Sequence, residues 1–286
     1  DDGCGGSCGV GCSGDEVCAP GGACVEWVLF RDTLFSIGSP EDEAGRSTVF
    51  DETRHSVWLN EDVLLPTMEV SQPWFEAVMG FNPSFDTTCS ECPVNDVSWN
   101  LAATFCNALS AMAGLPLCYD CAGALPTPEC ELSAEVATPY DCEGYRLPTE
   151  AEWEGAARAG TNTATYNGDI SLFDLSCDSP HPVLDPIAWF CGNSDRPQPR
   201  GLLEPNGEGL YDMLGNVIEL VHDYYAPYPG GGTSHDPWGP ATGTERVARG
   251  GAAGVPARYA RAASREPAEP DTVSWIAGFR PALTSR

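Results

Sequence analysis

Alternating apolar and polar positions mark the part of the chain that follows residue 26. Residues 27–39 (WVLFRDTLFSIGS) alternate in this way and predict a pair of strands in a core sheet. Residues 57–65 (VWLNEDVLL) predict one further strand, followed by residues 68–70. The folded part of the chain is therefore expected to begin as β-structure that directs alternate side chains into a core.

Three later segments carry the signals of helices. Their N-cap residues are Ser71, Ser98 and Thr149, and a glycine ends each of the first two segments. The third start, Thr-Glu-Ala-Glu, is a capping box. Apolar residues recur at helical spacing after Ser98, over residues 99–112. Three intervening stretches show no clear period and predict irregular chain: residues 115–143, 160–205 and 226–244.

Fourteen cysteines are divided between two regions of the chain. Five lie in residues 1–25, a glycine-rich N-terminal arm that has too few apolar residues to build a core and needs cross-links for order. Nine lie in the main domain, residues 26–286. Because both counts are odd, we predict one disulfide between the arm and the domain. One free thiol in each region is the alternative.

The cysteine spacing favours disulfides over zinc. The C-x-x-C pairs at 89–92 and 118–121 each resemble half a zinc knuckle, but further cysteines and prolines lie close by. We expect Cys177 and Cys191 to close one loop. Cys106 lies on the apolar face of a predicted helix, which indicates a buried or bridged residue rather than a nucleophile. This disulfide density predicts a secreted, periplasmic or cell-surface protein of a bacterium.

Charge excludes several classes of partner and reaction. The chain has 42 acidic residues against 14 arginines and no lysine, for a net charge of -28. Such a surface repels phosphate backbones, so no nucleic acid is expected. The lack of lysine excludes a lysine Schiff base and a P-loop. No apolar run approaches the roughly 20 residues of a transmembrane helix. The opening DDGCGG suggests a mature terminus, with room for a lipid-anchored cysteine upstream.

Four motifs, in order, resemble the formylglycine-generating-enzyme (sulfatase-modifying factor) family. They are YRLPTEAEWEGAARAG at 145–160, NGEGLYDMLGNVIEL at 206–220, RGG at 249–251 and GFR at 278–280. The resemblance extends from about Glu26 to the end of the chain. It implies an α+β, C-type-lectin-like fold: a twisted antiparallel sheet, short helices, much irregular structure and, here, many disulfides.

The family's enzymes, as the resemblance implies, oxidise a substrate cysteine with copper held by two thiolates between the RGG and GFR segments. This chain has no cysteine after Cys191, and residues 250–270 contain no Cys, Met or His. Soft Cu(I) needs such ligands. We therefore expect no copper and interpret the chain as non-catalytic, because fold resemblance alone does not carry an activity.

The resemblance also implies a structural calcium ion. The family's loop corresponds to residues 212–219, in which Asp212 and Glu219 would supply side-chain oxygens and Gly215 and Val217 carbonyl oxygens. The alternative is that Asp212 caps a turn and that Glu219 pairs with an arginine.

Arginines gather late in this acidic chain. Arg249, Arg258, Arg261 and Arg265 are candidates to line a ligand groove for an anionic group. They are also candidates for internal pairing with the many carboxylates, which we favour.

Two hypotheses of function follow. The first is a non-catalytic exported protein that binds a protein, peptide or glycan at the cell surface, or another copy of itself. The second is an enzyme of the same family with altered chemistry, acting on a peptide or small metabolite. An accessory role toward sulfatases is a third interpretation, which a basic or apolar peptide groove would favour.

Overall fold

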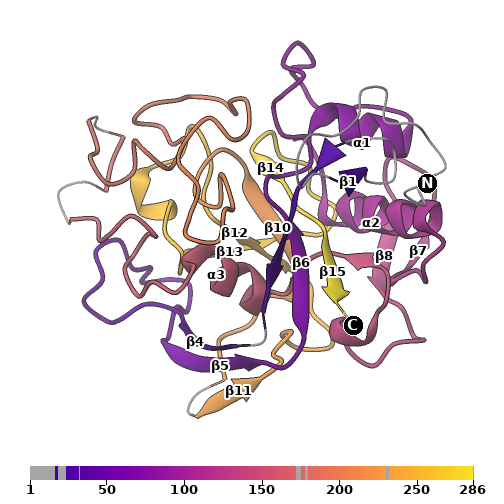
Figure 1. Cartoon of the computed structure of the whole chain (residues 1–286), viewed down its shortest axis with the longest axis horizontal. Helices are drawn as coiled ribbons and strands as arrows, with labels where there is room; N and C mark the ends of the chain where they lie inside the picture. Colours follow the sequence, from indigo (N-terminus) through magenta and orange to yellow (C-terminus); the bar gives the residue numbers. More distant parts are fainter. Residues whose placement is uncertain are drawn as a thin grey trace.

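A computed structural model describes residues 17–18, 24–31, 33–171, 175–177, 180–229 and 232–285. Most of the N-terminal arm lies outside these residues. The structure is α+β, with short helices, short strands and long irregular connections (Figure 1). No helix in these ranges is long and apolar enough to cross a bilayer.

The three predicted helices are confirmed at their predicted caps. They are α1 (Gln72–Met79), α2 (Trp99–Ala113) and α3 (Glu150–Arg158). The Ser71 hydroxyl accepts the Trp74 amide at 3.2 Å, and Gly80 ends α1 with a φ of 79°. Two 3-10 turns, η1 and η2, cover Pro139–Asp141 and Ala257–Tyr259.

The strands of the described residues form three larger sheets and two ribbons. The first sheet has the order β13-β12-β10-β14, which are Arg265–Ala268, Arg246–Arg249, Ile218–Tyr224 and Ala277–Gly278. The second has the order β3-β6-β15-β9, which are Trp27–Phe30, Asp62–Pro66, Ala282–Ser285 and Tyr145–Arg146. The third has the order β11-β5-β4, which are Thr233–His235, His55–Leu59 and Thr33–Ile37. The ribbons are β1-β2, Val17–Cys18 with Cys24–Val25, and β7-β8, Tyr119–Ala122 with Glu129–Leu132.

Two strand predictions were wrong in detail. Residues 57–65 do not form one strand, because β5 and β6 divide between two sheets. Residues 27–39 do form two strands, but β3 pairs with β6 and β4 pairs with β5, all antiparallel. Alternation identifies a strand without naming its partner, since the partner is chosen by the whole sheet.

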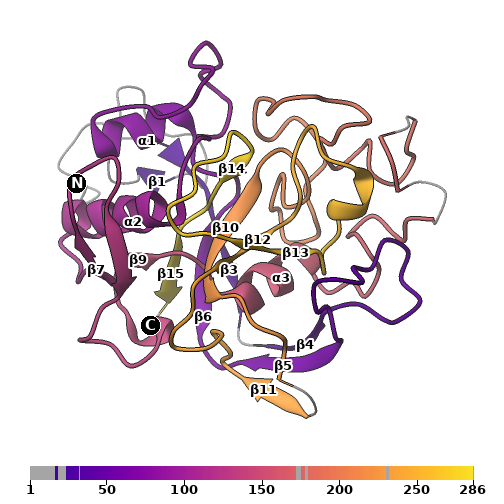
Figure 2. The ribbon, with the colours of Figure 1, turned by 180° about the vertical axis from the view of Figure 1, so that it is seen from behind.

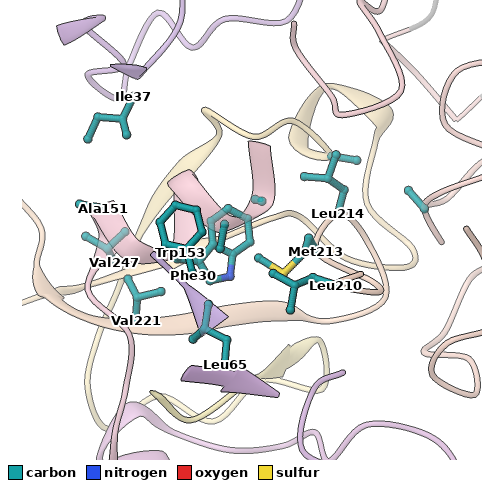
Figure 3. Packing of buried hydrophobic residues seen from close by; sticks show 14 of the residues in the cluster. Phe30, Ile37, Leu65, Ala151, Trp153, Leu210, Met213, Leu214, Val221 and Val247 are labelled. Carbon is teal, nitrogen blue, oxygen red and sulfur yellow. The ribbon is translucent and has the colours of Figure 1, made fainter. Parts of the chain in front are cut away.

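Two cores fill the molecule. One lies between α3 and the sheets, around Trp153, Phe30 and Val221 (Figure 3). The other surrounds α2, where Phe105 stacks on Phe75 at 5.3 Å and meets Phe279 edge-on at 5.2 Å. Helices α1 and α2 lie with β7 and β8 on one side of the central strands, in both views (Figures 1 and 2).

Helix α3 is buried along its whole length although it is rich in charge. Its three glutamates each bind arginine. The pairs are Glu150 with Arg265, Glu152 with Arg146, and Glu154 with both Arg158 and Arg249. These arginines come from α3 itself and from strands β9, β12 and β13, so ion pairs place strands far apart in sequence around one helix.

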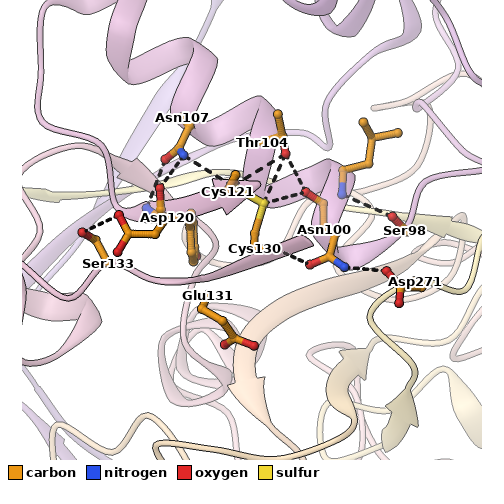
Figure 4. Close-up of a disulfide and its surroundings, with 12 residues drawn as sticks. Ser98, Asn100, Thr104, Asn107, Asp120, Cys121, Cys130, Glu131, Ser133 and Asp271 are labelled. Atoms are coloured by element: carbon orange, nitrogen blue, oxygen red, sulfur yellow. Dashed lines mark hydrogen bonds between the residues drawn. A yellow bond between two sulfur atoms is a disulfide. The ribbon is translucent and has the colours of Figure 1, made fainter. Parts of the chain in front are cut away.

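Four disulfides join cysteines of the main domain. They are Cys89–Cys92, Cys118–Cys142, Cys121–Cys130 and Cys177–Cys191. The predictions of disulfides rather than zinc, and of a loop closed by the last pair, are confirmed. The stretch predicted to be irregular, 115–143, contains the β7-β8 ribbon. The Asn107 amide donates to the Tyr119 carbonyl at 2.7 Å and ties this ribbon to α2 (Figure 4).

The predicted disulfide between arm and main domain was wrong. Eight of the domain's nine cysteines pair among themselves, and the ninth, Cys106, is free and fully buried. The pairing of the arm's five cysteines rests on residues outside the described ones. Burial raises the pKa of the Cys106 thiol well above its usual range, so this thiol is unsuited to act as a nucleophile.

Replacing Glu154 by Gln is expected to lower the free energy of unfolding by about 3–5 kcal/mol, because Arg249 and Arg158 lose a buried counter-charge. Urea unfolding at neutral pH measures the loss. Glu76→Gln, at an exposed position of α1, is the matched control and should change stability by no more than about 0.5 kcal/mol. Equal effects of the two substitutions would contradict a stabilising role for the α3 pairs.

Candidate functional site

A tight turn precedes β10 and orders the centre of the molecule. Asp212, Gly215 and Asn216 all adopt positive φ, of 55°, 82° and 57°. A Cβ at position 215 would lie 2.3 Å from the Trp189 carbonyl oxygen, so only glycine fits there.

Asn216 binds three segments that are distant in sequence. Its backbone carbonyl accepts the Ala253 amide at 3.0 Å, and its side-chain oxygen accepts the Gln198 amide at 2.8 Å. Its side-chain amide donates to Glu69 Oε1 at 3.1 Å. The segments around residues 198 and 253 therefore have fixed positions beside each other.

Glu219 does not fit the calcium role that the family loop implies. Both of its oxygens accept from Arg280, at 2.6 and 2.7 Å, and Trp153 Nε1 donates to one of them at 2.9 Å. Gly215 and Val217 are buried in the same turn, and the glutamate makes the arginine pair that was the alternative interpretation.

Asp212 retains a free acceptor. Its Oδ2 accepts the Gly201 amide at 2.6 Å, while Oδ1 is buried without a hydrogen-bond partner. Glu69 Oε2 is also buried without a hydrogen-bond partner, although Arg280 and Arg200 lie near both carboxylates. Burial raises the pKa of each carboxyl, and the charge of Asp212 raises the pKa of Glu69 further. Among the described residues, no three His, Cys, Asp or Glu side chains converge as a metal site.

Three of the four candidate arginines, Arg258, Arg261 and Arg265, line one cavity, and Arg249 does not. Arg249 is fully enclosed between Glu154, Glu150 and the carbonyls of residues 262–264. Arg261 and Arg265 are also buried, and their guanidinium groups bind carboxylates. Arg258 alone of the four is exposed. For the other three, internal pairing is what the structure shows.

A surface cleft of about 570 Å³ lies beside Gly254, which is within residues 250–270. We call it the aromatic cleft, and its lining residues are Phe85, Asp86, Asn95, Asp96, Asp195, Arg196, Pro197 and Trp275. Phe85 is 91% exposed and Trp275 is 47% exposed, so two large aromatic rings face solvent here.

The walls of the aromatic cleft are held by specific bonds. Asp96 Oδ2 accepts the Phe85 amide at 2.8 Å, and the Asp96 amide donates to the Ser274 carbonyl at 3.1 Å. Gly254 packs against Trp275 and Asp195, which form the other walls of the cleft. A Cβ at position 254 would lie 3.0 Å from the Trp275 ring and 3.2 Å from the Asp195 carbonyl oxygen. The side-chain oxygen of Asn95 is buried in this wall without a partner.

Sequence reasoning missed this cleft. Its residues come from three separate loops, and neither period nor motif marks them. The one available signal was an aromatic residue, Trp275, shortly before the GFR motif in a loop of small and polar residues.

The family of the chain is now shown. The model of the sulfatase-modifying factor enzyme 1-like domain matches residues 24–285, and the chain belongs to that family. Formylglycine-generating enzyme of Thermomonospora curvata is 37% identical over 151 residues, which are 48% of each chain. The chain thus spans about half the length of that enzyme. Chaperone protein LppX of Paenibacillus barcinonensis is 29% identical over 231 residues, covering 70% of this chain and 82% of the relative.

Solved structures agree on the fold. Treponema denticola variable protein 1 superposes with a TM-score of 0.74 at 28% identity, over 91% of this chain and 95% of that one. PvdO from Pseudomonas aeruginosa gives a TM-score of 0.69 at 22% identity, over 92% and 95%. The predicted α+β fold of the formylglycine-generating-enzyme type is therefore confirmed.

The pair of Glu52 and Arg261 predicts a pH dependence of stability. Burial alone raises the pKa of Glu52, but the hydrogen bonds and charge of Arg261 outweigh it and hold the pKa below the usual 4.5. A depressed pKa gives stability that is present above about pH 4.5 and lost as the pH falls through the folded-state pKa.

Glu52→Gln should therefore be less stable than the native chain by a constant amount at higher pH, and this difference should shrink under acid. Urea unfolding between neutral and acidic pH measures it. Glu41→Gln changes an exposed residue that precedes Glu52 in the sequence. Its stability is expected to equal that of the native chain over the whole pH range. A difference that grows as the pH falls would refute the assignment.

Proposed function

We propose that this chain is a binding member of its family rather than a formylglycine-generating enzyme, and that it acts outside a reducing cytoplasm. Its ligand is a peptide segment of another protein, held in the aromatic cleft. The observation that carries the proposal is the position of this cleft: it adjoins Gly254, in the stretch where the family's thiolate pair is expected, and offers exposed aromatic rings in place of thiols.

The lack of available thiols argues against oxidase chemistry. Among the domain's nine cysteines, eight are in disulfides and Cys106 is buried with a raised pKa. A soft copper ion needs two thiolates free of such bonds. The four domain disulfides also support a location where thiols are oxidised, such as the periplasm, the cell surface or the medium.

The chemistry of the cleft supports a peptide that combines a basic and an apolar side chain. Asp86, Asp96 and Asp195 contribute three carboxylates against one arginine, Arg196. Phe85 and Trp275 offer ring faces for apolar and cationic side chains. The net charge of -28 attracts a basic partner at long range. A relative named as a chaperone is compatible with a protein ligand.

Selection from a random peptide library against the native protein tests this proposal. Enriched peptides should combine Arg or Lys with an aromatic or aliphatic residue. Their affinity, measured by fluorescence polarisation, should fall at least about tenfold in Trp275→Ala, because the aromatic ring that the bound peptide would cover is lost.

Trp58→Ala is the matched control, since Trp58 is similarly exposed, at 41%, and lies on strand β5, outside the aromatic cleft. It should bind like the native chain. Peptides that bind both variants equally would place the ligand elsewhere, and a library that yields no specific binder would contradict the peptide proposal itself.

We also propose that calcium stabilises the turn at residues 212–217, with Glu69 in the role that Glu219 has lost. Two buried carboxylate oxygens without partners, on Asp212 and Glu69, support a hard cation there. The carbonyls of Gly215 and Val217 belong to the same turn. Glu219 is left to Arg280.

Metal analysis by mass spectrometry tests this site. The purified chain should contain calcium and no copper, and chelation should lower its melting temperature. Asp212→Asn should abolish the response to calcium, while Asp195→Asn, at an exposed position, should keep it. A melting temperature that calcium leaves unchanged in the native chain would remove the ion from the proposal, and bound copper at about one per chain would revive the oxidase.

One observation favours the second candidate function, an enzyme with altered chemistry. A cavity of about 450 Å³ is lined by Asp223, His55, Tyr228 and Trp238. Burial and the neighbouring Glu150 charge raise the pKa of Asp223 well above its usual range, as for a carboxylic acid that donates a proton. An activity that is lost in Asp223→Asn and kept in Trp275→Ala would support this candidate over the peptide proposal.

A further inference from the structure

A third cavity, of about 380 Å³, concentrates positive charge in a chain that is otherwise acidic. Four of the 14 arginines line it: Arg46, Arg258, Arg261 and Arg265. The cavity is separate from the aromatic cleft, with which it shares no lining residue. Four guanidinium groups at one cavity, in a chain of net charge -28, need an explanation.

Two of the four arginines are fully occupied by protein groups. Arg261 binds Glu52 at 2.8 and 2.9 Å and Glu43 at 2.6 Å, and its Nε donates to the Arg258 carbonyl. Arg265 binds both oxygens of Glu150 at 2.7 Å. The positive charges of these two arginines are neutralised by glutamates. They therefore determine the shape of the cavity wall rather than the affinity of the cavity for a ligand.

The other two arginines keep unused donors. Arg46 uses only Nη1, for Ser39 and the Glu52 carbonyl, so its Nε and Nη2 have no partner among the described residues. Arg258 is exposed and makes one weak bond, from Nη2 to the Tyr259 hydroxyl at 3.3 Å, while its guanidinium lies 4.7 Å from that ring. Neither guanidinium forms an ion pair with a described carboxylate.

The backbone holds these two arginines close together. A Cβ at Gly45 would lie 3.2 Å from Arg258 Cβ and 3.2 Å from Arg261 Nε, so the turn that carries Arg46 packs directly on the Arg258–Arg261 segment. A φ of 83° at Gly45 favours glycine in this turn.

Other groups at the cavity add donors and supply few free acceptors. Glu52, the carboxylate that lines the cavity, already accepts two hydrogen bonds at each oxygen. The Ser264 hydroxyl lines the cavity and makes no bond within the described part of the chain. A site with free guanidinium donors, a hydroxyl and satisfied acceptors is complementary to an anion.

We propose that this cavity binds a sulfate or phosphate group, held between Arg46 and Arg258. Two planar guanidinium forks suit a tetrahedral oxyanion, which accepts several hydrogen bonds at once. The volume exceeds that of a single ion, and the rings of Phe50 and Tyr259 form an apolar side for the group that carries the anion. The ligand class is therefore an aryl or alkyl phosphate or sulfate ester, with the free ion as its weaker analogue.

Calorimetric titration of the full chain tests the site, with inorganic sulfate, inorganic phosphate and phenyl phosphate as probes at one fixed ionic strength. Fixed ionic strength is needed because the acidic surface repels anions and salt screens this repulsion. All three probes should bind at one site, with phenyl phosphate tightest. Arg258→Gln should weaken each by about tenfold or more, because hydrogen bonds from a charged donor are lost.

Arg258→Lys keeps the charge but loses the fork, so its affinity should fall between those of the native chain and Arg258→Gln. Arg31→Gln is the matched control: Arg31 is exposed and lies outside the cavity, so binding should be unchanged. Because Arg258 is exposed, the Gln variant should unfold at the same urea concentration as the native chain.

Two results would overturn the proposal. One is a native chain in which none of the three probes gives a saturable binding signal larger than that of chloride. The other is Arg258→Gln with native affinity. Binding of the inorganic ions without a gain for phenyl phosphate would overturn the ester as ligand class and leave a free-ion site. The test does not depend on the aromatic cleft, so Trp275→Ala should bind all three probes normally.

Discussion

The ion pairs of helix α3 are the interaction on which the rest of the structure depends. A nine-residue helix with three buried glutamates is an unfavourable core element unless each charge is paired. Here each glutamate meets an arginine, and the arginines lie on β9, β12 and β13 as well as on α3 itself. Removing one partner leaves a buried charge, so the pairs fix one arrangement of the strands. Arginine suits this task because its planar fork binds both carboxylate oxygens.

The same constraint explains how irregular chain can carry binding sites. Long loops lose much conformational entropy when they are ordered. This chain compensates with disulfides, buried ion pairs and the hydrogen bonds of Asn216 to three distant segments. Asn216 and Gly254 fix one side of the aromatic cleft, and the Glu52–Arg261 pair fixes one side of the arginine-lined cavity. Rigid walls then leave exposed groups such as Trp275 and Arg258 at defined positions.

Local features of the sequence predicted more than distant ones. The helices were predicted correctly because their N-cap residues, Ser71, Ser98 and Thr149, are recognisable from the few residues around them. Strand partners and the arm-to-domain disulfide were wrong because they depend on which segments meet in space. Glu219 was assigned to calcium by motif, yet Arg280, sixty-one residues away, takes both its oxygens. The aromatic cleft and the buried, unpartnered oxygens of Asp212 and Glu69 arise in the same way, from contacts that only the folded chain assembles.

The nested disulfides of the β7-β8 region have a further consequence. Cys121–Cys130 closes the ribbon, and Cys118–Cys142 encloses it from outside. A protease that cuts the backbone once anywhere between residues 118 and 142 therefore leaves the two halves of the protein covalently joined. The exposed tip of the ribbon becomes a place where the chain tolerates damage, and a nicked molecule keeps α2 and its core in register.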